Sequence, residues 1–376
     1  MVGNDSASRE RVLAALAGQP TDRVPVHFEF GPAWDRFRAR GIANPDAHFG
    51  VDLKKIWFLP KVEPEAARPE TPSPPGAAKV GNAQQVATYR LWNYAPQSID
   101  RRNPLIHARN LEDIAAHRFP SIDAPGETER LRSAVAGHHA AGFAVAGQIP
   151  YLGGVIFETA YRLRGLDNFL EDLRGRPDFA EALLERITEN AARNVTQLAA
   201  TGVDIVFLGD DIGMPTSMLI SPGLWRQWLK PRLARVIQAA RKVLPSVPIA
   251  YHSDGWYWPV IDDLVEIGVN ILNPVQPDCM DPNALRARFG RRLALWGTVG
   301  SATLMPFSTP QEVFEEVRRR VAELGQAGGL VLAPAYDLED DVPLANIEAF
   351  FAACRSSGEA PGSPGRRRGK PGNAGT

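Results

Sequence analysis

Short apolar runs recur along this chain, and stretches with a helical pattern separate most of them. The runs occupy positions 24–30, 51–59, 143–149, 203–208, 248–251, 269–272, 293–296 and 329–332. Their β-branched, aromatic and aliphatic residues often continue without a polar alternation. Such runs are typical of strands in a parallel sheet that is covered on both faces. The pattern therefore predicts eight buried strands.

Amphipathic helices are expected between these strands. The stretch 178–200 has a stripe of apolar residues at spacings of three and four, formed by Leu183, Ile187, Ala191, Val195 and Leu198. A capping box from Thr309 to Glu312 opens another helix, and Ser221 caps a third, in which Pro231 predicts a kink. Strands that alternate with helices imply right-handed crossovers and a parallel sheet. Eight such units predict an α/β fold, the TIM (β/α)8 barrel.

The barrel is expected to form one domain over residues 1–355, with an N-terminal insertion and a C-terminal tail. Within the insertion, residues 61–82 are rich in Pro, Ala and Glu and predict an irregular excursion, whereas 89–94 predict a hairpin strand. Residues 356–376 are rich in Gly, Pro and Arg and predict a disordered tail. A doubly wound sheet is the alternative fold, but no predicted strand is followed by the GxGxxG turn of a dinucleotide site.

Composition excludes several classes of partner. The 376 residues are 44% hydrophobic and carry a net charge of -1, which gives no basic field for nucleic acid. No apolar stretch approaches the roughly 20 residues of a membrane helix, and no secretory signal is expected at the N-terminus. The two cysteines, Cys279 and Cys354, lie far apart, which argues against a disulfide framework and predicts a reducing, cytoplasmic location.

Ionisable side chains directly follow several predicted strands. His252 and Asp254 are two residues apart on an extended chain, so their side chains point to the same side. Asp210 and Asp211 follow an earlier strand, and Tyr336 follows the last one. Barrel enzymes carry their chemistry at the carboxyl ends of the strands, so we predict that these five residues are catalytic. The structural alternative is a hydrogen-bonded histidine beside aspartates that cap helices.

A second set of residues is predicted to bind the substrate. His27 and Glu29 share one face of the first strand, where Glu29 lies at the carboxyl end. Gln276 follows a later strand, and Trp256 and Trp296 offer flat walls for an aromatic or corrin-like ligand. Outer-surface hydrogen bonds for the first two, and packing for the tryptophans, are the alternatives.

The order of several motifs resembles the uroporphyrinogen decarboxylase superfamily. These motifs are RERVLAALAGQPTDRVPV, GDDIG with SPGLWRQWLKPR, YHSDG with DDLVEIGVNILNPVQP, LWGTV, and GLVLAPAYDLEDDVPLANI. The resemblance covers almost the whole chain up to Ala353 and implies a TIM barrel. It also implies one of two activities. One branch decarboxylates uroporphyrinogen without a cofactor, and the other transfers a methyl group from a corrinoid protein to a thiol that zinc activates.

Departures from the two patterns favour the methyltransferase branch. The decarboxylases have an arginine-bearing motif after the first strand and a histidine at the position of Tyr336, whereas this chain has GPAW after that strand. The methyltransferases have a His-x-Cys pair of zinc ligands at YHSDG and another Cys near the last strand end. This chain keeps His252 and has Asp254 at the Cys position.

We therefore expect a corrinoid-linked methyltransferase acting on a small molecule or thiol. The implied cofactors are zinc, held by His252 and Asp254 with Glu29 or Cys279, and methylcobalamin carried by a partner protein. Without metal, the same His–Asp pair suits proton transfer. Two alternatives stay open: a cofactor-free decarboxylase of uroporphyrinogen or another polycarboxylate, and a degenerate barrel that only binds a corrinoid or small ligand. The oligomeric state, a homodimer included, is also open.

Overall fold

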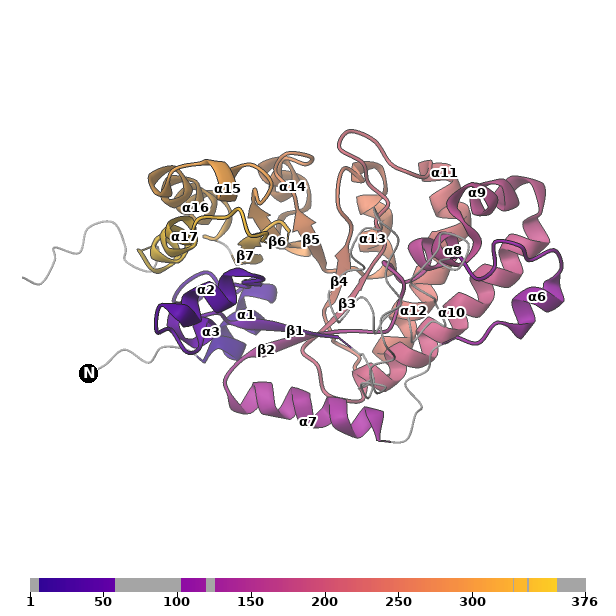
Figure 1. Ribbon diagram of the computed structural model, residues 1–376, viewed down its shortest axis with the longest axis horizontal. Helices are drawn as coiled ribbons and strands as arrows, with labels where there is room; N and C mark the ends of the chain where they lie inside the picture. The colour runs from indigo at the N-terminus through magenta and orange to yellow at the C-terminus, as the bar shows by residue number, and fades with distance from the viewer. Residues whose placement is uncertain (1–6, 58–102, 120–125, 327, 337, 357–376) are drawn as a thin grey trace, which may run out of the picture.

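Parallel strands form the centre of the molecule, in a computed structural model that describes residues 7–57, 103–119, 126–326, 328–336 and 338–356 (Figure 1). Seven of them form one sheet: β1 (Leu53–Trp57), β2 (Ala144–Gln148), β3 (Ile205–Gly209), β4 (Ile249–His252), β5 (Ile271–Val275), β6 (Ala294–Val299) and β7 (Leu330–Pro334). Each strand pairs in parallel with the next one along the chain. The predicted α/β, TIM-like class is confirmed.

The first predicted strand, at 24–30, is not a regular strand, so the expectation of eight full strands was wrong there. Its Val26 forms a parallel bridge with Leu332 of β7, and His27 forms one with Leu53 of β1. The segment thus lies between the two edge strands and links them. Its ladder is short because Pro25 has no N–H to donate and the Val26 N–H donates to the Asp52 carboxylate at 2.8 Å instead.

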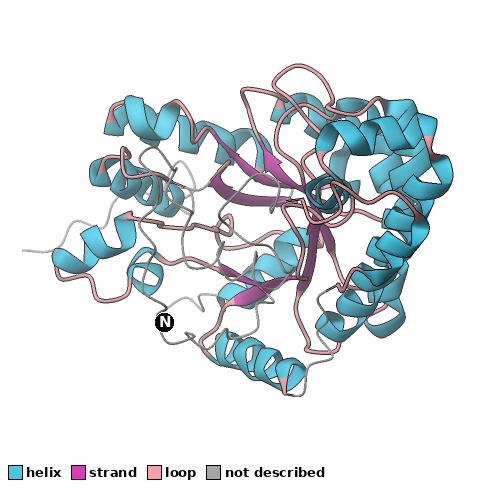
Figure 2. Ribbon diagram, turned by 45° about the vertical axis from the view of Figure 1, so that its right-hand side comes forward, coloured by secondary structure: helices cyan, strands magenta, loops and turns pink. Residues whose placement is uncertain are grey.

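Helices lie outside the strands (Figure 2). The α-helices are α1 (Ser8–Leu16), α2 (Ala33–Ala39), α3 (Pro45–Phe49), α6 (Leu111–Ala116), α7 (Glu127–Ala140), α8 (Phe157–Arg164), α9 (Leu166–Gly175), α10 (Pro177–Ala199), α11 (Pro222–Leu224), α12 (Lys230–Val243), α13 (Ile261–Ile267), α14 (Pro282–Phe289), α15 (Leu304–Phe307), α16 (Pro310–Leu324) and α17 (Leu344–Ser356). Short 3₁₀ turns occupy Trp258–Val260 and Gly290–Arg292.

The predicted helix signals are confirmed where the structure describes them. Thr309 and Glu312 form a reciprocal capping box at the start of α16. Ser221 accepts a hydrogen bond from the Leu224 N–H at the start of α11. The expected disturbance near Pro231 takes the form of a π-helical turn, Trp225–Leu229, which precedes α12 and leaves Pro231 in that helix's first turn.

Small and aromatic side chains fill the interior of the curled sheet. This interior core contains Leu53, Ala144, Ala146, Ile205, Phe207, Ala250, Ile271, Ala294, Trp296, Val331 and Ala333. Helix α1 adds Val12 and Leu16 to it, and its Ala15 carbonyl accepts a hydrogen bond from the N–H of Gly329, just before β7. The helix therefore closes the amino ends of the strands, and the carboxyl ends remain for a site.

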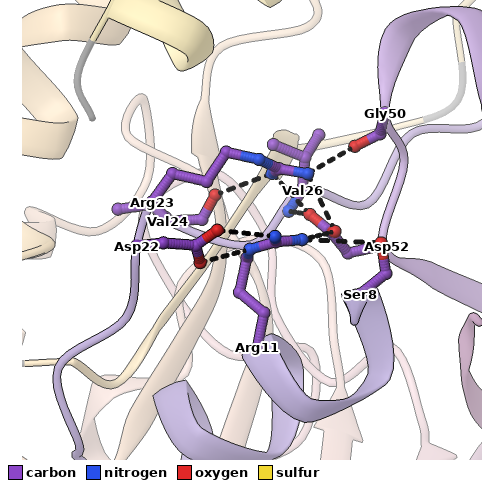
Figure 3. Close-up of polar contacts among 8 residues, drawn as sticks. All are labelled: Ser8, Arg11, Asp22, Arg23, Val24, Val26, Gly50 and Asp52. Atoms are coloured by element: carbon purple, nitrogen blue, oxygen red, sulfur yellow. Dashed lines mark hydrogen bonds and ion pairs between the residues drawn. The ribbon is translucent and has the colours of Figure 1, made fainter. Parts of the chain in front are cut away.

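A buried network of charges joins α1 to the strands beside it (Figure 3). The Asp52 carboxylate is fully buried and accepts hydrogen bonds from the guanidinium groups of Arg11 and Arg23. Arg11 also pairs with Asp22 at 2.7 Å, and the Asp22 partner holds the pKa of Arg11 above its usual value although burial works to lower it. In barrels, fixed charges at this end serve stability rather than chemistry.

Other expectations fall partly outside the described residues. The irregular excursion at 61–82, the hairpin at 89–94 and the tail beyond Ser356 belong there. Among the helices that the structure does describe, none combines the length and the hydropathy needed to cross a bilayer.

Candidate active site

Asp211, His252 and Asp254 lie together at the carboxyl ends of β3 and β4, and we call them the carboxylate–histidine cluster. Each offers one donor atom, and these atoms lie within 4.8 Å of one another. Parallel pairing places Gly209, two residues before Asp211, opposite His252. The His252 Nε2 is 3.7 Å from Asp211 Oδ1, which also accepts the Asp254 N–H at 2.9 Å. Two carboxylates and one imidazole thus converge from two strand ends.

The His252 ring is held in one orientation by the next strand. Its Nδ1 lies 2.8 Å from the Asn273 side-chain oxygen, and the two residues are directly paired between β4 and β5. A carbonyl oxygen at this position accepts Nδ1–H, so the Nε2 atom faces Asp211. Metal-binding histidines are oriented in this way by their second nitrogen. Sequence reasoning missed Asn273, although it directly follows a predicted strand.

The Asp211 backbone is held by a buried carboxyl group that the sequence did not single out. Glu158, in the first turn of α8, accepts the Asp211 N–H at 3.0 Å. Burial, reinforced by the Asp211 carboxylate, raises the pKa of Glu158. The lack of a side chain at Gly154 lets the backbone lie close to both carboxyl groups, since a Cβ there would lie 2.2 Å from Asp210 Oδ1 and 2.8 Å from Glu158 Oε2. In the sequence, the pair Gly153-Gly154 just before a predicted helix could have indicated a close approach of the chain and drawn attention to Glu158.

Asp210 points to a different place from its neighbour. Its buried carboxylate accepts the backbone N–H groups of Ile156 and Glu158 at the start of α8. Burial and the nearby Glu158 raise the pKa of Asp210 well above its usual value. This is the helix-capping arrangement weighed as an alternative for the Asp210–Asp211 pair. A catalytic part for Asp210 stays a prediction.

The loops that carry the cluster pack backbone against backbone. Gly255, next to Asp254, has φ 78°, and a Cβ there would lie 2.6 Å from the Gly213 carbonyl carbon. Its N–H donates to the side-chain oxygen of Gln276 at 2.6 Å, so this predicted substrate-binding residue holds the turn. Trp256 continues the turn, with its N–H on the Met214 carbonyl at 2.7 Å. The geometry fixes Asp254 from both sides.

His27, Glu29 and Lys55 form a second polar group, at the segment 24–30 and the neighbouring strand β1, beside the interior core. His27 and Glu29 are 3.4 Å apart, and Glu29 pairs with Lys55 of β1 at 2.8 Å. Burial works to raise the pKa of Glu29, but Lys55 and His27 together lower it, so the carboxylate is charged. The His27 ring meets Trp296 edge to face at 4.9 Å. The structure thus brings together His27, Glu29 and Trp296, and adds Lys55, which sequence reasoning missed.

Two further residues were expected near the chemistry. Tyr336 follows β7 and is 55% exposed. Cys279 follows β5, and burial together with Asp278 and Asp254 raises the pKa of its thiol. The third donor beside His252 and Asp254 is Asp211, whereas Glu29 is engaged with Lys55. Asp211 thus takes the place of Glu29 or Cys279 as the expected third ligand.

The cluster's donors fit a divalent metal ion. Zinc accepts imidazole nitrogen and carboxylate oxygen, and catalytic sites often use three protein ligands so that one position stays open. Asn273 supplies the outer hydrogen bond to the histidine, and Glu158 supplies one to the Asp211 backbone. His252, Asp211 and Asp254 are therefore the residues that would hold such an ion.

Comparison with known proteins identifies the family. A profile described as Uroporphyrinogen decarboxylase (URO-D) matches residues 100–357. The chain belongs to the URO-D family. The resemblance predicted from the order of the motifs is thereby confirmed.

Relatives of both kinds are found. The chain is 23% identical over 370 residues to "Methylcobamide:CoM methyltransferase MtaA" of Methanosarcina barkeri, covering 92% of this chain and 96% of the other. It is 22% identical over 180 residues to "Uroporphyrinogen decarboxylase 1, chloroplastic" of Oryza sativa subsp. japonica, covering 48% and 42%. The solved structure of a methyltransferase from Methanosarcina mazei shares the fold, with a TM-score of 0.57 at 18% identity over 93% of this chain and 99% of that one.

Proposed function

We propose that this URO-D protein transfers a methyl group from a methylated corrinoid to a thiol. The observation that carries the proposal is the carboxylate–histidine cluster, which occupies the strand end where the resemblance implies a His-x-Cys zinc pair. Two carboxylates supply the same charge as the two thiolates of that pattern. The similarity to a methylcobamide:CoM methyltransferase over nearly the full length supports the same reading.

The reaction needs a thiolate in line with the methyl carbon. The thiol loses its proton to solvent, sulfur attacks the methyl carbon, and the carbon–sulfur bond forms as the carbon–cobalt bond breaks, with its electron pair left on cobalt. A metal ion on the cluster would supply a lower thiol pKa. Asn273 fixes the His252 ring, Glu158 fixes the Asp211 backbone, and Gly255 allows the turn that presents Asp254.

Metal content and methyl transfer test the proposal together. Protein purified without chelators is expected to hold about one zinc per chain and to methylate a thiol with methylcobalamin as donor. His252→Ala should lose both the metal and the transfer. His107→Ala, which replaces an exposed histidine in the turn that contacts Arg164 at the end of α8, should keep both. A wild-type protein with no metal and no transfer would overturn the proposal, and corrinoid binding alone would then support the non-catalytic barrel.

Decarboxylation is the second candidate because of the decarboxylase relative in rice. A polycarboxylate substrate calls for free cations in the mouth of the barrel. Lys55 faces the interior but is already paired with Glu29. Consumption of uroporphyrinogen by metal-free protein would favour this candidate over methyl transfer.

The activity is assigned to the chain as one unit. We take residues 1–355 as a single (β/α)8 barrel in which the segment around Val26 completes the ring. The bridges to β7 and β1 support this assignment. The methyl donor is expected to be a corrinoid carried by a partner protein.

A further inference from the structure

Lys55 is a cation that faces the inside of the curled sheet. Its strand neighbour is Ala146, which belongs to the interior core, and its Nζ lies 5.5 Å from the centre of the Phe207 ring. The adjacent Lys54 points to the opposite face, as the alternation of a strand requires, and pairs with Asp46. Lysine is rarely placed inside a core unless it is paired or has a function.

Lys55 is paired, but its partner is within reach of a ligand. The Glu29 and Lys55 side chains are 35% and 15% exposed, so solvent reaches both. Each group keeps hydrogen-bonding capacity beyond their mutual contact, because an ammonium has three donors and a carboxylate about four acceptor sites. Burial lowers the pKa of the adjacent His27, so its ring is neutral at pH 7. Lys55 and Glu29, which we call the subsite, thus place one positive and one negative charge side by side.

Two polar atoms without partners lie on elements beside this pair. Among the described residues, Gln148 Oε1 and Trp296 Nε1 are both buried and make no hydrogen bond. Gln148 lies on the same face of β2 as the core residue Ala146, and Trp296 packs against His27. Buried polar atoms are normally satisfied, so unpaired ones in a mouth indicate a ligand or ordered water. Together they offer both donors and acceptors.

One aromatic ring connects the subsite to the carboxylate–histidine cluster. The Phe207 ring centre is 5.5 Å from Lys55 Nζ and 5.7 Å from the centre of the His252 ring. Trp296 meets the same ring edge to face at 5.4 Å. Phe207 is itself buried, so it acts as a spacer that sets the separation between the charged pair and the cluster.

We propose that Lys55 and Glu29 bind the zwitterionic head group of an amino-acid thiol. Lys55 receives the carboxylate, Glu29 receives the ammonium group, and the sulfur end extends past the position of Phe207 to the carboxylate–histidine cluster. This assignment rests on the proposed methyl transfer and names the class of its acceptor.

Charge balance favours a zwitterion over a simple anion. Glu29 neutralises Lys55, and a divalent ion on the carboxylate–histidine cluster would neutralise Asp211 and Asp254, so neither end offers a surplus of positive charge to an anion. A lone carboxylate or sulfonate at Lys55 would bring an uncompensated negative charge into a partly desolvated place beside the Glu29 carboxylate. A zwitterion adds no net charge and gives each member of the pair a second partner.

Affinities of three related thiols test the proposal on the zinc-loaded full chain. The probes are homocysteine, the corresponding mercapto acid without the amino group, and the corresponding aminothiol without the carboxylate, measured by calorimetry. Wild type is expected to bind homocysteine about ten- to a hundred-fold more tightly than either truncated thiol, since each loses one charge-assisted contact. Equal or tighter binding of the mercapto acid would overturn the proposal.

The variants should show a crossed pattern. Lys55→Met keeps an apolar stem over Phe207 and is expected to weaken homocysteine about tenfold or more while leaving the aminothiol nearly unchanged. Glu29→Gln should weaken homocysteine but not the mercapto acid. Lys54→Met, on the other face of the same strand, is the control and should change none of the three affinities. Uniform losses across all three thiols would mean that the pair is only structural.

The two proposals fail in different ways. If zinc binds and simple thiols are methylated without any preference for the amino-acid head, the head-group assignment is wrong and methyl transfer stands. If homocysteine is preferred and the crossed pattern holds but no methyl transfer occurs, the subsite stands and the proposed reaction is wrong.

Discussion

Replacing Asp52 by alanine should destabilise the fold more than any surface change. In the structure, this carboxylate is fully buried and accepts hydrogen bonds from Arg11, from Arg23 and from the Val26 N–H. Its removal takes one of two carboxylate partners from the Arg11 guanidinium, which is only 4% exposed, and leaves the Val26 N–H without its acceptor. Removing one member of a buried ion pair typically costs about 3–5 kcal/mol. Because Arg11 keeps Asp22 as a partner, we expect a loss near the lower end, about 3 kcal/mol.

Urea unfolding followed by circular dichroism measures this loss, through the midpoint at an unchanged slope. Asp262→Ala is the control, because Asp262 pairs with Arg288 where the two side chains are 58% and 52% exposed. Exposed pairs contribute below about 1 kcal/mol. A second variant adds Arg11→Met to Asp52→Ala and should recover part of the loss, since the buried guanidinium that lacks one partner is gone and Asp22 is exposed enough to be hydrated. If Asp52→Ala costs no more than Asp262→Ala, the network does not hold α1 to the strands and the reasoning is refuted.

Three further predictions concern the cluster and one histidine. Asn273→Ala and Glu158→Ala should each weaken zinc binding about ten- to a hundred-fold, measured by competition with a chelator, because outer partners orient the ligands; unchanged affinity would contradict their positioning roles. Gly255→Ala should destabilise the fold more than Gly142→Ala. Both glycines have positive φ, but a Cβ at Gly255 would lie 2.6 Å from other backbone, whereas a Cβ at Gly142 would have nothing within 4 Å. Equal urea midpoints for the two variants would contradict this. Burial, with Arg186 nearby, lowers the pKa of His117 from 6.5 to about 4. The unfolded chain therefore binds a proton more readily than the folded protein between these pH values. As the pH falls from 6.5 towards 4, wild type should lose stability relative to His117→Gln. A difference in melting temperature that does not change between pH 7 and pH 5 would count against this.

The sequence was sufficient to predict the strand order and one edge of the site. Apolar runs locate buried strands, and a two-residue spacing after such a run places His252 and Asp254 on one side. What it did not decide is which of Asp210 and Asp211 faces the cluster. Adjacent residues in an irregular turn point in directions set by contacts far along the chain, here the amides of α8 and the Asp254 N–H.

Other site residues were hidden by their local sequence. Lys55 stands in LKKIW, where two lysines side by side suggest an exposed strand. Its interior position depends on the register between β1 and β2, which the chain itself does not reveal. Asn273 and Glu158 act through contacts with residues 21 and 53 positions away, beyond any local pattern.

Among the described residues, the segment at Val26 and His27 joins β7 and β1 through one parallel bridge to each strand, fewer than the paired residues between neighbouring strands of the sheet. The same segment leads within two residues to Glu29. A molecule that binds this carboxylate only while the two bridges are formed would stabilise the contact between β1 and β7, because a ligand stabilises the state to which it binds.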